Sequence, residues 1–507
     1  MIAPNLEPGR RSMAFSLLAF LLLVPWARGD VTYVEGERGG LRPTVVRMTV
    51  SPAAAPSPAL KHRLIARDID LKPGNAAPYY YRTFIAARRG RDVARQEFPE
   101  DELSRWYTTG QYSTPLSELP LARLQRAVEL TSGGSILREL AEATSRRECD
   151  WQLGIRELRG PQIIVFELDE FQHGREITRV LSLRTRLALA QRRYDDAIDS
   201  MRMNYRLARD TASEPLLVCG LIGIAQAMIM NGPLVELIAA PDSPNMYWAL
   251  KELPEPFVDL RPAVRFEGSF AARIFPFLKD AETAERSPDE WNRLYQQMIR
   301  DLPSIRGAPG FHTPNHELGA ALLAMAAYPH AKSQLIEQGL DRAKVEQMSV
   351  GQVIADYTQR VTQRMTDEFE KLSYMPFWEA RVRAAEVDKR LRDMNAFQGG
   401  ADREVVPLVT VLSPSIHAAR EAQVRLDREL AALRVIEALR MYAASHDGKL
   451  PERLNAISEV PIPLNPATGQ PFVYRLDGET AILELPAEDG FGRDGRYNRR
   501  FEISIKH

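Results

Sequence analysis

The stretch SVGQVIADYTQRVTQRMTDEFEKL, residues 349–372, indicates the fold class most directly. Ser349 and Gln352 have the spacing of a capping box, in which the serine caps the first turn of a helix and the glutamine bonds back to it. The apolar residues that follow recur at steps of three and four, which places them on one helix face. They are Ile354, Tyr357, Val361, Met365, Phe369 and Leu372. Such a face packs against other helices, so the stretch predicts a helix within a helical body.

Similar signals recur over the middle of the chain. The segment Ser287-Pro288-Asp289-Glu290 combines a capping serine, a proline at the first helical position and a glutamate placed to bond back. The helix that it opens carries one apolar stripe, formed by Trp291, Leu294, Met298 and Leu302. Because helical periodicity dominates this whole region, we predict an α-helical array over residues 79–395.

One pair of predicted helices has the character of a repeat unit. Residues 181–190 form the first helix, Gln191-Arg192-Arg193 the turn, and Tyr194 begins the second helix. The spacing Tyr194-x-x-Ala197-Ile198 resembles the second helix of a tetratricopeptide repeat, where a small alanine lets two helices approach closely. No clear second copy follows at the repeat's period of about 34 residues. The resemblance therefore implies an irregular array of helical hairpins.

The C-terminal region has a different pattern. Ser413 is a capping residue, Pro414 occupies the first helical position, and Gly448 ends a helix that runs to about His446. Three short runs of alternating residues follow, typical of strands, at residues 472–476, 481–485 and 501–505. We predict that residues 413–507 form a small α+β module, a long helix covered by a short antiparallel sheet. Residues 396–412 are the expected linker to the helical array.

The residues before the helical array differ in composition. Residues 30–78 are rich in proline, glycine and β-branched residues. Residues 45–50 read as a strand, whereas residues 51–58 form a Pro/Ala/Ser stretch that cannot be helical throughout. We expect residues 30–78 to be an extended arm that leads into the main body.

The first residues have the organisation of a secretory signal peptide. Arg10 and Arg11 precede an apolar run over residues 13–24, and Ala27-Arg28-Gly29 supplies small residues at the positions that a signal peptidase reads. The run is shorter than the ~20 residues that a spanning helix needs. We predict a signal peptide over residues 1–29 with cleavage before Asp30, and an uncleaved membrane anchor is the alternative. We expect no membrane span after cleavage.

Composition and cysteine content limit the function classes. Lys and Arg total 66 against 67 Asp and Glu, so no global positive field would attract nucleic acid, and we expect no nucleic-acid partner. The two cysteines, Cys149 and Cys219, could pair outside the cytoplasm. Two cysteines in a long chain are not a disulfide framework, so we favour unpaired residues, with Cys219 a small buried apolar side chain.

The C-terminal module resembles the globular part of the major pseudopilins of type II secretion. The likeness rests on residues 446–451, HDGKLP, and on residues 465–474, NPATGQPFVY. It implies the helix-plus-sheet fold. The processing site and continuous apolar N-terminal helix of a pseudopilin are missing here, so filament formation is not implied. Pseudopilins also hold calcium in an acidic loop, whereas Glu488-Asp489-Gly490 with Asp494 is only loosely similar and reads as a solvated turn.

The whole chain resembles a family of exported proteins of planctomycete-type bacteria. These proteins pair a helical body, with phrases such as Asn245-Met246-Tyr247-Trp248-Ala249-Leu250, with this same C-terminal module. The resemblance implies location and architecture, and it implies no activity.

Candidate chemical groups are few. His312, His316 and Glu317 form the most metal-like cluster, since two histidines four residues apart can chelate from one helix face. However, Thr313-Pro314 reads as a helix start, which leaves His312 outside the helix, and Glu317 is explained by the helix dipole. We therefore expect no metal and no cofactor.

Three further groups of residues have a structural explanation beside a chemical one. Ser132-Gly133-Gly134-Ser135 lacks the lysine of a phosphate loop and reads as a helix entrance. Glu167 with Asp169-Glu170 could act as general acid and base, but such carboxylates are common. Tyr79-Tyr80-Tyr81 near Arg82, Arg88, Arg89 and Arg91 could bind a polyanion, although a core edge with a solvated face is the favoured interpretation.

No catalytic, cofactor or metal residue is therefore assigned. We expect an exported, non-catalytic helical scaffold that presents a concave surface to a protein or peptide partner. The alternatives are an exported hydrolase-like enzyme, whose site is assembled from residues distant in sequence, and an accessory of a secretion or pilus-like system. A pocket with clustered ionisable groups would favour the enzyme.

Overall fold

The computed structural model describes residues 31–34, 43–163, 168–302, 316–393, 403–406, 408–486 and 498–506. Over these residues the chain is mainly helical, with a small sheet that includes the C-terminal strands. This confirms the predicted fold class of a helical array followed by a small α+β module.

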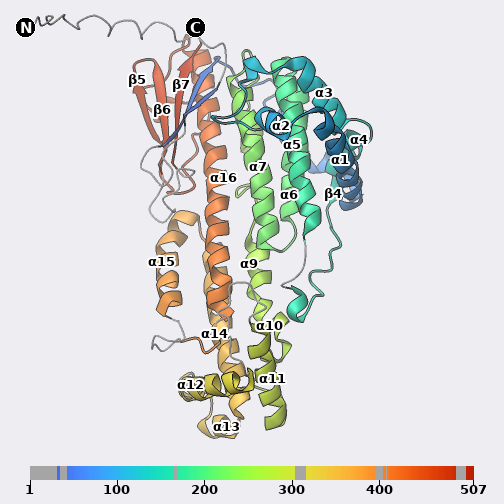
Figure 1. Ribbon diagram of the computed structural model, residues 1–507. Coiled ribbons are helices and arrows are strands. Elements are labelled where there is room, and N and C mark those ends of the chain that lie inside the picture. The colour runs from blue at the N-terminus through green and yellow to red at the C-terminus, as the bar shows by residue number, and fades with distance from the viewer. Residues whose placement is uncertain are drawn as a thin grey trace, which may run out of the picture.

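Four long helices lie side by side along the length of the molecule (Figure 1). They are α5 (Asp169–Ala190), α6 (Tyr194–Ala212), α7 (Leu217–Ala239) and α16 (Leu408–Ser445). The turn between α5 and α6 falls at Gln191-Arg192-Arg193, as predicted, and Arg192 takes a positive φ of 56° there. The hairpin predicted from the sequence is thus confirmed, and α7 adds a third helix against it.

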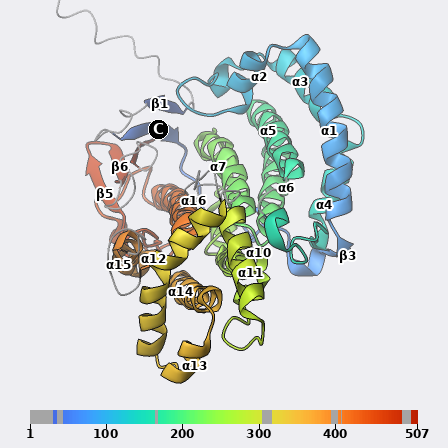
Figure 2. The ribbon, with the colours of Figure 1, turned by 60° about the horizontal axis from the view of Figure 1, so that its bottom comes forward.

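Further helices cover both sides of these four. In Figure 2 the N-terminal helices form a curved layer outside α5 and α6. They are α1 (Ala77–Glu97), α2 (Glu100–Tyr107), α3 (Leu121–Ser132) and α4 (Ile136–Thr144). The connection from α7 carries α8 (Tyr247–Lys251), α9 (Arg261–Gly268) and α10 (Phe270–Ile274), and α15 (Phe377–Asp393) stands beside α16.

The end of the molecule away from the sheet is built around α14 (Val350–Ser373), with α11 (Pro288–Asp301), α12 (His316–Glu337) and α13 (Arg342–Gln347) against it. The two predicted serine caps are confirmed, because the hydroxyls of Ser287 and Ser349 accept hydrogen bonds from the backbone N–H groups of Glu290 and Gln352. The side chain of Gln352 does not bond back to the cap as expected but donates to the carbonyl of Ala281. The apolar stripe predicted on α14 is buried along its whole length.

The sheet contains five strands in the order β1-β2-β7-β6-β5. They are β1 (Thr32–Val34), β2 (Thr44–Val50), β5 (Val473–Asp477), β6 (Thr480–Leu485) and β7 (Arg499–Ile505). The three C-terminal strands pair antiparallel, as predicted. Val46, Phe501 and Leu483 lie opposite one another in this register and are fully buried, so one face of the sheet is apolar and covers α16.

The expectation for residues 30–78 was incomplete. Residues 30–78 are not only an arm, because β2 pairs in parallel with β7 and extends the sheet with β1 at its edge. An ion pair of 2.8 Å between Arg47 and Glu502 spans this pairing. The module therefore needs both chain ends, which local pattern alone cannot reveal because pairing between distant segments depends on the assembled fold. Further on, β3 (Lys72–Asn75) pairs with β4 (Arg146–Glu148).

The bounds of the long helix also differ from the prediction. α16 begins at Leu408, so Ser413 and Pro414 lie within it and are not its cap and first position. Pro414 is the seventh residue of this helix, so its lack of an N–H group removes one helical hydrogen bond to the carbonyl four residues earlier. Much of the expected linker, residues 396–402, lies outside the described residues. The predicted end is confirmed, since Gly448 takes a φ of 76° and its N–H bonds to the carbonyl of Ala443.

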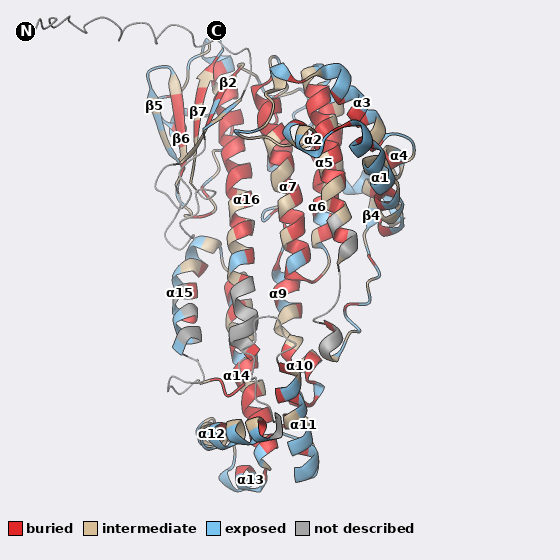
Figure 3. Cartoon of the chain, in the orientation of Figure 1, coloured by how far each residue is buried: buried red, intermediate tan, exposed pale blue. Residues whose placement is uncertain are grey.

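α16 lies at the centre of the packing, between the sheet and α7 (Figure 3). Besides its apolar stripe it buries several charges. The Arg440 guanidinium, fully buried, pairs with Glu437 at 3.0 Å and donates to the carbonyls of Ser51 and Ser243. A buried cation needs such partners to offset its lost hydration. This arginine therefore ties the N-terminal segment and the end of α7 to the long helix.

One helix contradicts the expectation that no later segment could span a bilayer. α7 is long and apolar enough to cross a membrane by length and composition. It packs against α5, α6 and α16, and most of it is buried among them. Its uniform apolarity is explained by neighbours on several sides, which is the pattern of a helix inside a core.

Candidate functional site

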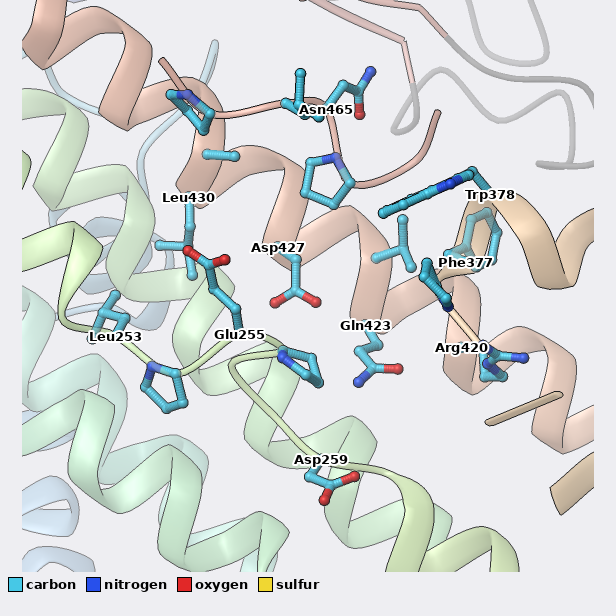
Figure 4. A pocket seen from close by; sticks show the side chains of 18 of the residues that line it. Leu253, Glu255, Asp259, Phe377, Trp378, Arg420, Gln423, Asp427, Leu430 and Asn465 are labelled. Atoms are coloured by element: carbon cyan, nitrogen blue, oxygen red, sulfur yellow. The ribbon is translucent and has the colours of Figure 1, made fainter. Parts of the chain in front are cut away.

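A cavity of about 700 Å³ lies where the helical body meets the C-terminal module (Figure 4). Four segments form its walls. They are residues 250–264 around the connection from α8 to α9, residues 373–378 at the corner between α14 and α15, residues 420–434 of α16, and the loop 461–466 that precedes the sheet. Ligand pockets commonly have this volume and this position between two parts of a protein.

One face of α16 supplies the polar groups on the long wall. Arg420, Gln423, Asp427 and Arg434 all line the cavity. Their spacings of three, four and seven residues return to the same side of a helix, which explains why one face carries all four. The Gln423 side chain donates to the carbonyl of Val258 at 2.6 Å. This bond fixes the opposite wall to the helix and leaves the amide oxygen of Gln423 without a hydrogen-bond partner among the described residues.

Asp427 lies near the middle of the cavity, between Glu255 and Gln423 (Figure 4). Its carboxyl accepts a hydrogen bond of 2.9 Å from the backbone N–H of Phe257. Burial, supported by the nearby negative charge of Glu255, raises the pKa of Asp427 to about 7, although the Phe257 hydrogen bond opposes the shift. Asp427 has no cationic partner in the described part of the chain. At neutral pH it can therefore donate or accept a proton.

The other two acidic groups in the cavity are already paired. The Glu255 carboxylate accepts a hydrogen bond of 2.6 Å from the Arg434 guanidinium and one of 3.2 Å from the Lys251 ammonium. Asp259 accepts two bonds from the Arg261 guanidinium, at 2.7 and 2.8 Å. The carboxylates of Glu255 and Asp259 are thus bound by protein cations, so among the described lining residues Asp427 and Arg420 are the charged groups without a partner of opposite charge.

Arg420 is the cation without an acidic partner. Its guanidinium donates to the backbone carbonyl of Met375 at 3.3 Å, and no carboxylate of the described residues pairs with it. Burial lowers the pKa of Arg420. A partly desolvated guanidinium attracts an anion strongly, because little water screens the charge.

Aromatic side chains and the C-terminal loop close the remaining side. The side chains of Phe377 and Trp378, at the start of α15, form the part of the wall nearest to Arg420 (Figure 4). The Trp378 ring lies against the turn at Gly469, where a Cβ would come within 2.6 Å of it. Gly469 has a φ of 68°, and the side chain of Asn465 accepts from the N–H of Ala467 to hold this turn. Asn465 and Pro466 at the start of this turn thus form part of the rim of the cavity.

The arrangement combines an apolar, proline-rich lining with two unsatisfied charges. Six prolines line the cavity and offer rigid apolar surface without backbone N–H groups: Pro254, Pro256, Pro376, Pro461, Pro463 and Pro466. Chemically, such a site can hold a ligand that has an apolar body, an anionic group for Arg420 and a cationic or hydrogen-bonding group for Asp427.

The groups singled out from the sequence lie elsewhere. His312 and Glu167 fall outside the described residues, and so does the acidic turn at Glu488-Asp489-Gly490 with Asp494. His316 is the first residue of α12, and Asp169-Glu170 begin α5. The side chains of these residues and of Glu317 are not among those that the structure describes. Within the described ranges no cluster of three metal-ligating side chains exists.

The aromatic cluster at the start of α1 lies at the edge of the core, which is the interpretation favoured from the sequence. Tyr80 is fully buried, donates to Asp210 at 2.7 Å and stacks on Trp151. Arg88 and Arg89 are exposed, and the guanidinium of Arg82 lies over the ring of Tyr79. The glycine loop also has the favoured role, since Gly133-Gly134 joins α3 to α4.

The cysteines and a neighbouring serine and histidine also lie outside the cavity. Cys149 and Cys219 are unpaired, and Cys219 is buried, as favoured. At the end of α16, Ser445 lies 3.0 Å from His446 Nδ1 and donates to Glu459 at 2.5 Å. The Ser445 proton is thus directed to the carboxylate, and His446 Nδ1 lies 2.9 Å from the carbonyl of Tyr442. This geometry suits a helix end and not a nucleophile activated by a base.

Sequence reasoning assigned no site residues and so missed Arg420, Gln423 and Asp427. A signal was available, because these polar residues share one face of a helix predicted to be covered by a sheet. The sequence could not reveal the cavity itself. It forms because the turn at Met375-Phe377 and the loop at Pro461 do not pack directly against this face of α16. Comparison with known proteins adds nothing to the geometry: no protein-family model, curated protein or solved structure matches the chain.

Proposed function

We propose that the protein is an exported, non-catalytic binding protein that holds a short stretch of polypeptide in the cavity between its helical body and its C-terminal module. The observation that carries this proposal is the cavity of about 700 Å³, whose apolar walls surround an unpaired guanidinium and an unpaired carboxyl. Extended polypeptide combines apolar side chains with regularly spaced polar groups, so it matches both kinds of surface.

The proposal for export rests on the N-terminal sequence. Arg10-Arg11, the apolar run over residues 13–24 and the small residues of Ala27-Arg28-Gly29 fit a cleaved signal peptide. The mass of the protein recovered from its cell envelope tests this point. A mature chain that begins at Asp30 is expected, and an intact N-terminus would contradict cleavage.

The binding proposal is tested by native mass spectrometry of the mature protein. The probe is a mixture of peptides from three to eight residues long, prepared with free ends and with blocked ends, and a complex of protein and peptide is expected. The variant Ala431→Phe places a ring into the cavity, since Ala431 lines it, and should abolish the complex. Ala55→Phe on the exposed N-terminal segment is the matched control. Binding that survives Ala431→Phe in a folded protein, or no binding at all, would contradict the proposal.

A second candidate, an exported hydrolase, is supported by one observation. Asp427 and Glu255 lie close together in different environments, Asp427 with its pKa raised to about 7 by burial and Glu255 held by two cations. Two neighbouring carboxyl groups whose environments differ in this way can serve as general acid and general base. The same incubations separate the candidates. Peptides recovered intact support binding, whereas cleavage that Asp427→Asn abolishes would establish the enzyme.

A further inference from the structure

The polar groups of the cavity are ordered along α16. Arg420 comes first, Gln423 one turn later and Asp427 a further turn on, all on the cavity face (Figure 4). Seven residues of helix separate Arg420 from Asp427, which is about 10 Å along the axis. Arg434 lies two turns beyond Asp427 on the same face, but it is paired with Glu255. Between Arg420 and Asp427 the site therefore changes from cationic to acidic, and a hydrogen-bonding amide lies between them.

The cationic end suits a carboxylate. Among the described residues the Arg420 guanidinium has one bond, to the Met375 carbonyl, so most of its five N–H donors are not used by this part of the chain. A planar guanidinium binds a carboxylate through two parallel hydrogen bonds, and the apolar surface of Phe377 beside it reduces screening by water.

The acidic end suits an ammonium group. Asp427 has no cationic partner among the described residues. The other charged groups around the cavity form two clusters: Glu255 with Lys251 and with Arg434 of α16 itself, and Asp259 with Arg261. The loop 461–466 contributes no charge there. The first cluster has one carboxylate and two cations, and the second has one of each, so the carboxylates of both are already bound by protein cations. Among the described residues that line the cavity, Asp427 is therefore the carboxyl that a ligand cation would meet without a cation already bound to it.

These observations fix the length and the polarity of a ligand. A peptide extends about 3.3–3.6 Å per residue, so about three residues bridge the ~10 Å between the two ends. We propose that the cavity binds a short peptide of about three residues with both ends free, its terminal ammonium at Asp427 and its terminal carboxylate at Arg420. The amide oxygen of Gln423 accepts from a peptide N–H in the middle, and the apolar walls take the central side chain.

This inference rests on the proposed function and narrows it, since a segment inside a longer chain has no charged ends to offer. The discriminating probe is a mixture of Ala-Xaa-Ala peptides, with Xaa covering the coded amino acids, in free, N-acetylated and C-amidated forms. Native mass spectrometry of the mature protein should show complexes with the free forms. Blocking either end should weaken binding about tenfold or more, because each end loses a charge-assisted hydrogen bond.

Variants assign the two ends. Arg420→Gln should remove the preference for a free carboxylate and keep the preference for a free amino end, and Asp427→Asn should do the opposite. Arg88→Gln and Asp477→Asn, on exposed surfaces, make the same chemical changes away from the cavity and should leave binding unchanged. Far-UV circular dichroism verifies that each variant is folded.

The acidic end also predicts the pH dependence of binding. Asp427 is charged only above its pKa of about 7, so affinity for the free peptides should rise from about pH 5.5 to about pH 7.5. In Asp427→Asn this rise should vanish. If end-blocked peptides bind as well as free ones, the inference is overturned and the proposed function stands. If no peptide binds, both fail.

Discussion

Gly469 shows how a single residue shapes the wall of the cavity. It has a φ of 68°, and its missing side chain lets the Trp378 ring lie directly against the turn. Gly478, in the turn between β5 and β6, has a similar φ of 60° but open space around it. The two glycines therefore separate the cost of backbone conformation from the cost of crowding.

We predict that Gly469→Ala destabilises the protein more than Gly478→Ala. Both substitutions place a side chain in the left-handed region, at about 1–2 kcal/mol, and only the first also displaces Trp378, which adds about 1–3 kcal/mol. Urea denaturation measures both changes. Equal losses in the two variants would show that Trp378 does not depend on the missing side chain.

Asp427 makes stability depend on pH in a direction that can be worked out. Burial raises its pKa to about 7 in the folded protein, above the value of about 4 in an unfolded chain. Between these values the folded state binds more protons, so the free energy of unfolding falls as pH rises from about 4 to about 7. Glu267, whose pKa burial also raises to about 7, acts in the same direction.

We predict that Asp427→Asn flattens this fall and is more stable than the natural protein above about pH 7. The difference between the two curves should change by up to about 1.4 kcal/mol per pH unit inside the window. Denaturant titrations at several pH values measure it. A difference that is constant across this range would contradict the assignment. Glu267 still titrates in the variant and so serves as an internal reference.

At the scale of elements, α5 and α7 are joined by a buried ion pair. The Arg186 guanidinium binds Glu236 at 2.8 and 2.9 Å and is itself fully buried. It also donates to the carbonyls of Trp106 and Thr108, at 2.6 and 3.1 Å, at the end of α2. One side chain thus holds three elements together.

We predict that Glu236→Leu destabilises the protein by about 3–5 kcal/mol, because it leaves the Arg186 cation buried without its counter-ion. Glu97→Leu breaks an exposed pair with Arg126 and should cost about 0–1 kcal/mol. Thermal unfolding compares the two variants. In addition, hydrogen exchange should increase around Trp106 and Thr108 only in Glu236→Leu. Similar losses in the two variants would refute the role given to this pair.

The elements themselves were largely predictable from the sequence. The caps at Ser287 and Ser349, the turn at Gln191-Arg192-Arg193 and the C-terminal strands follow local rules of hydrogen bonding and periodicity, which act within a few residues. The pairing of β2 with β7 and the cavity depend on segments far apart in the chain. No local rule determines such contacts, so the site could not be found from the sequence, although the polar face of α16 indicated where to search.

At the scale of the whole molecule, the two ends of the chain share one sheet. Val46 of β2 is fully buried opposite Phe501 of β7, and the carbonyl of Ser51 accepts from Arg440 of α16. The C-terminal module is therefore completed by the first described residues, and it should not unfold separately from them.

We predict that Val46→Asp lowers the melting temperature of the whole protein in a single transition, because it buries a charge between the sheet and α16. Arg47→Gln on the exposed face of the same strand should change it little. Circular dichroism and tryptophan fluorescence should give the same midpoint. Separate transitions by the two probes would show that the helical body and the sheet unfold independently.

The central claim is that the cavity between the helical body and the C-terminal module binds a short free peptide with a fixed polarity. A crystal structure of the mature protein with the tightest-binding Ala-Xaa-Ala peptide tests it most directly. We predict that the peptide lies along α16 with its amino end at Asp427 and its carboxylate at Arg420. A peptide bound outside the cavity, or with its ends reversed, would contradict the account.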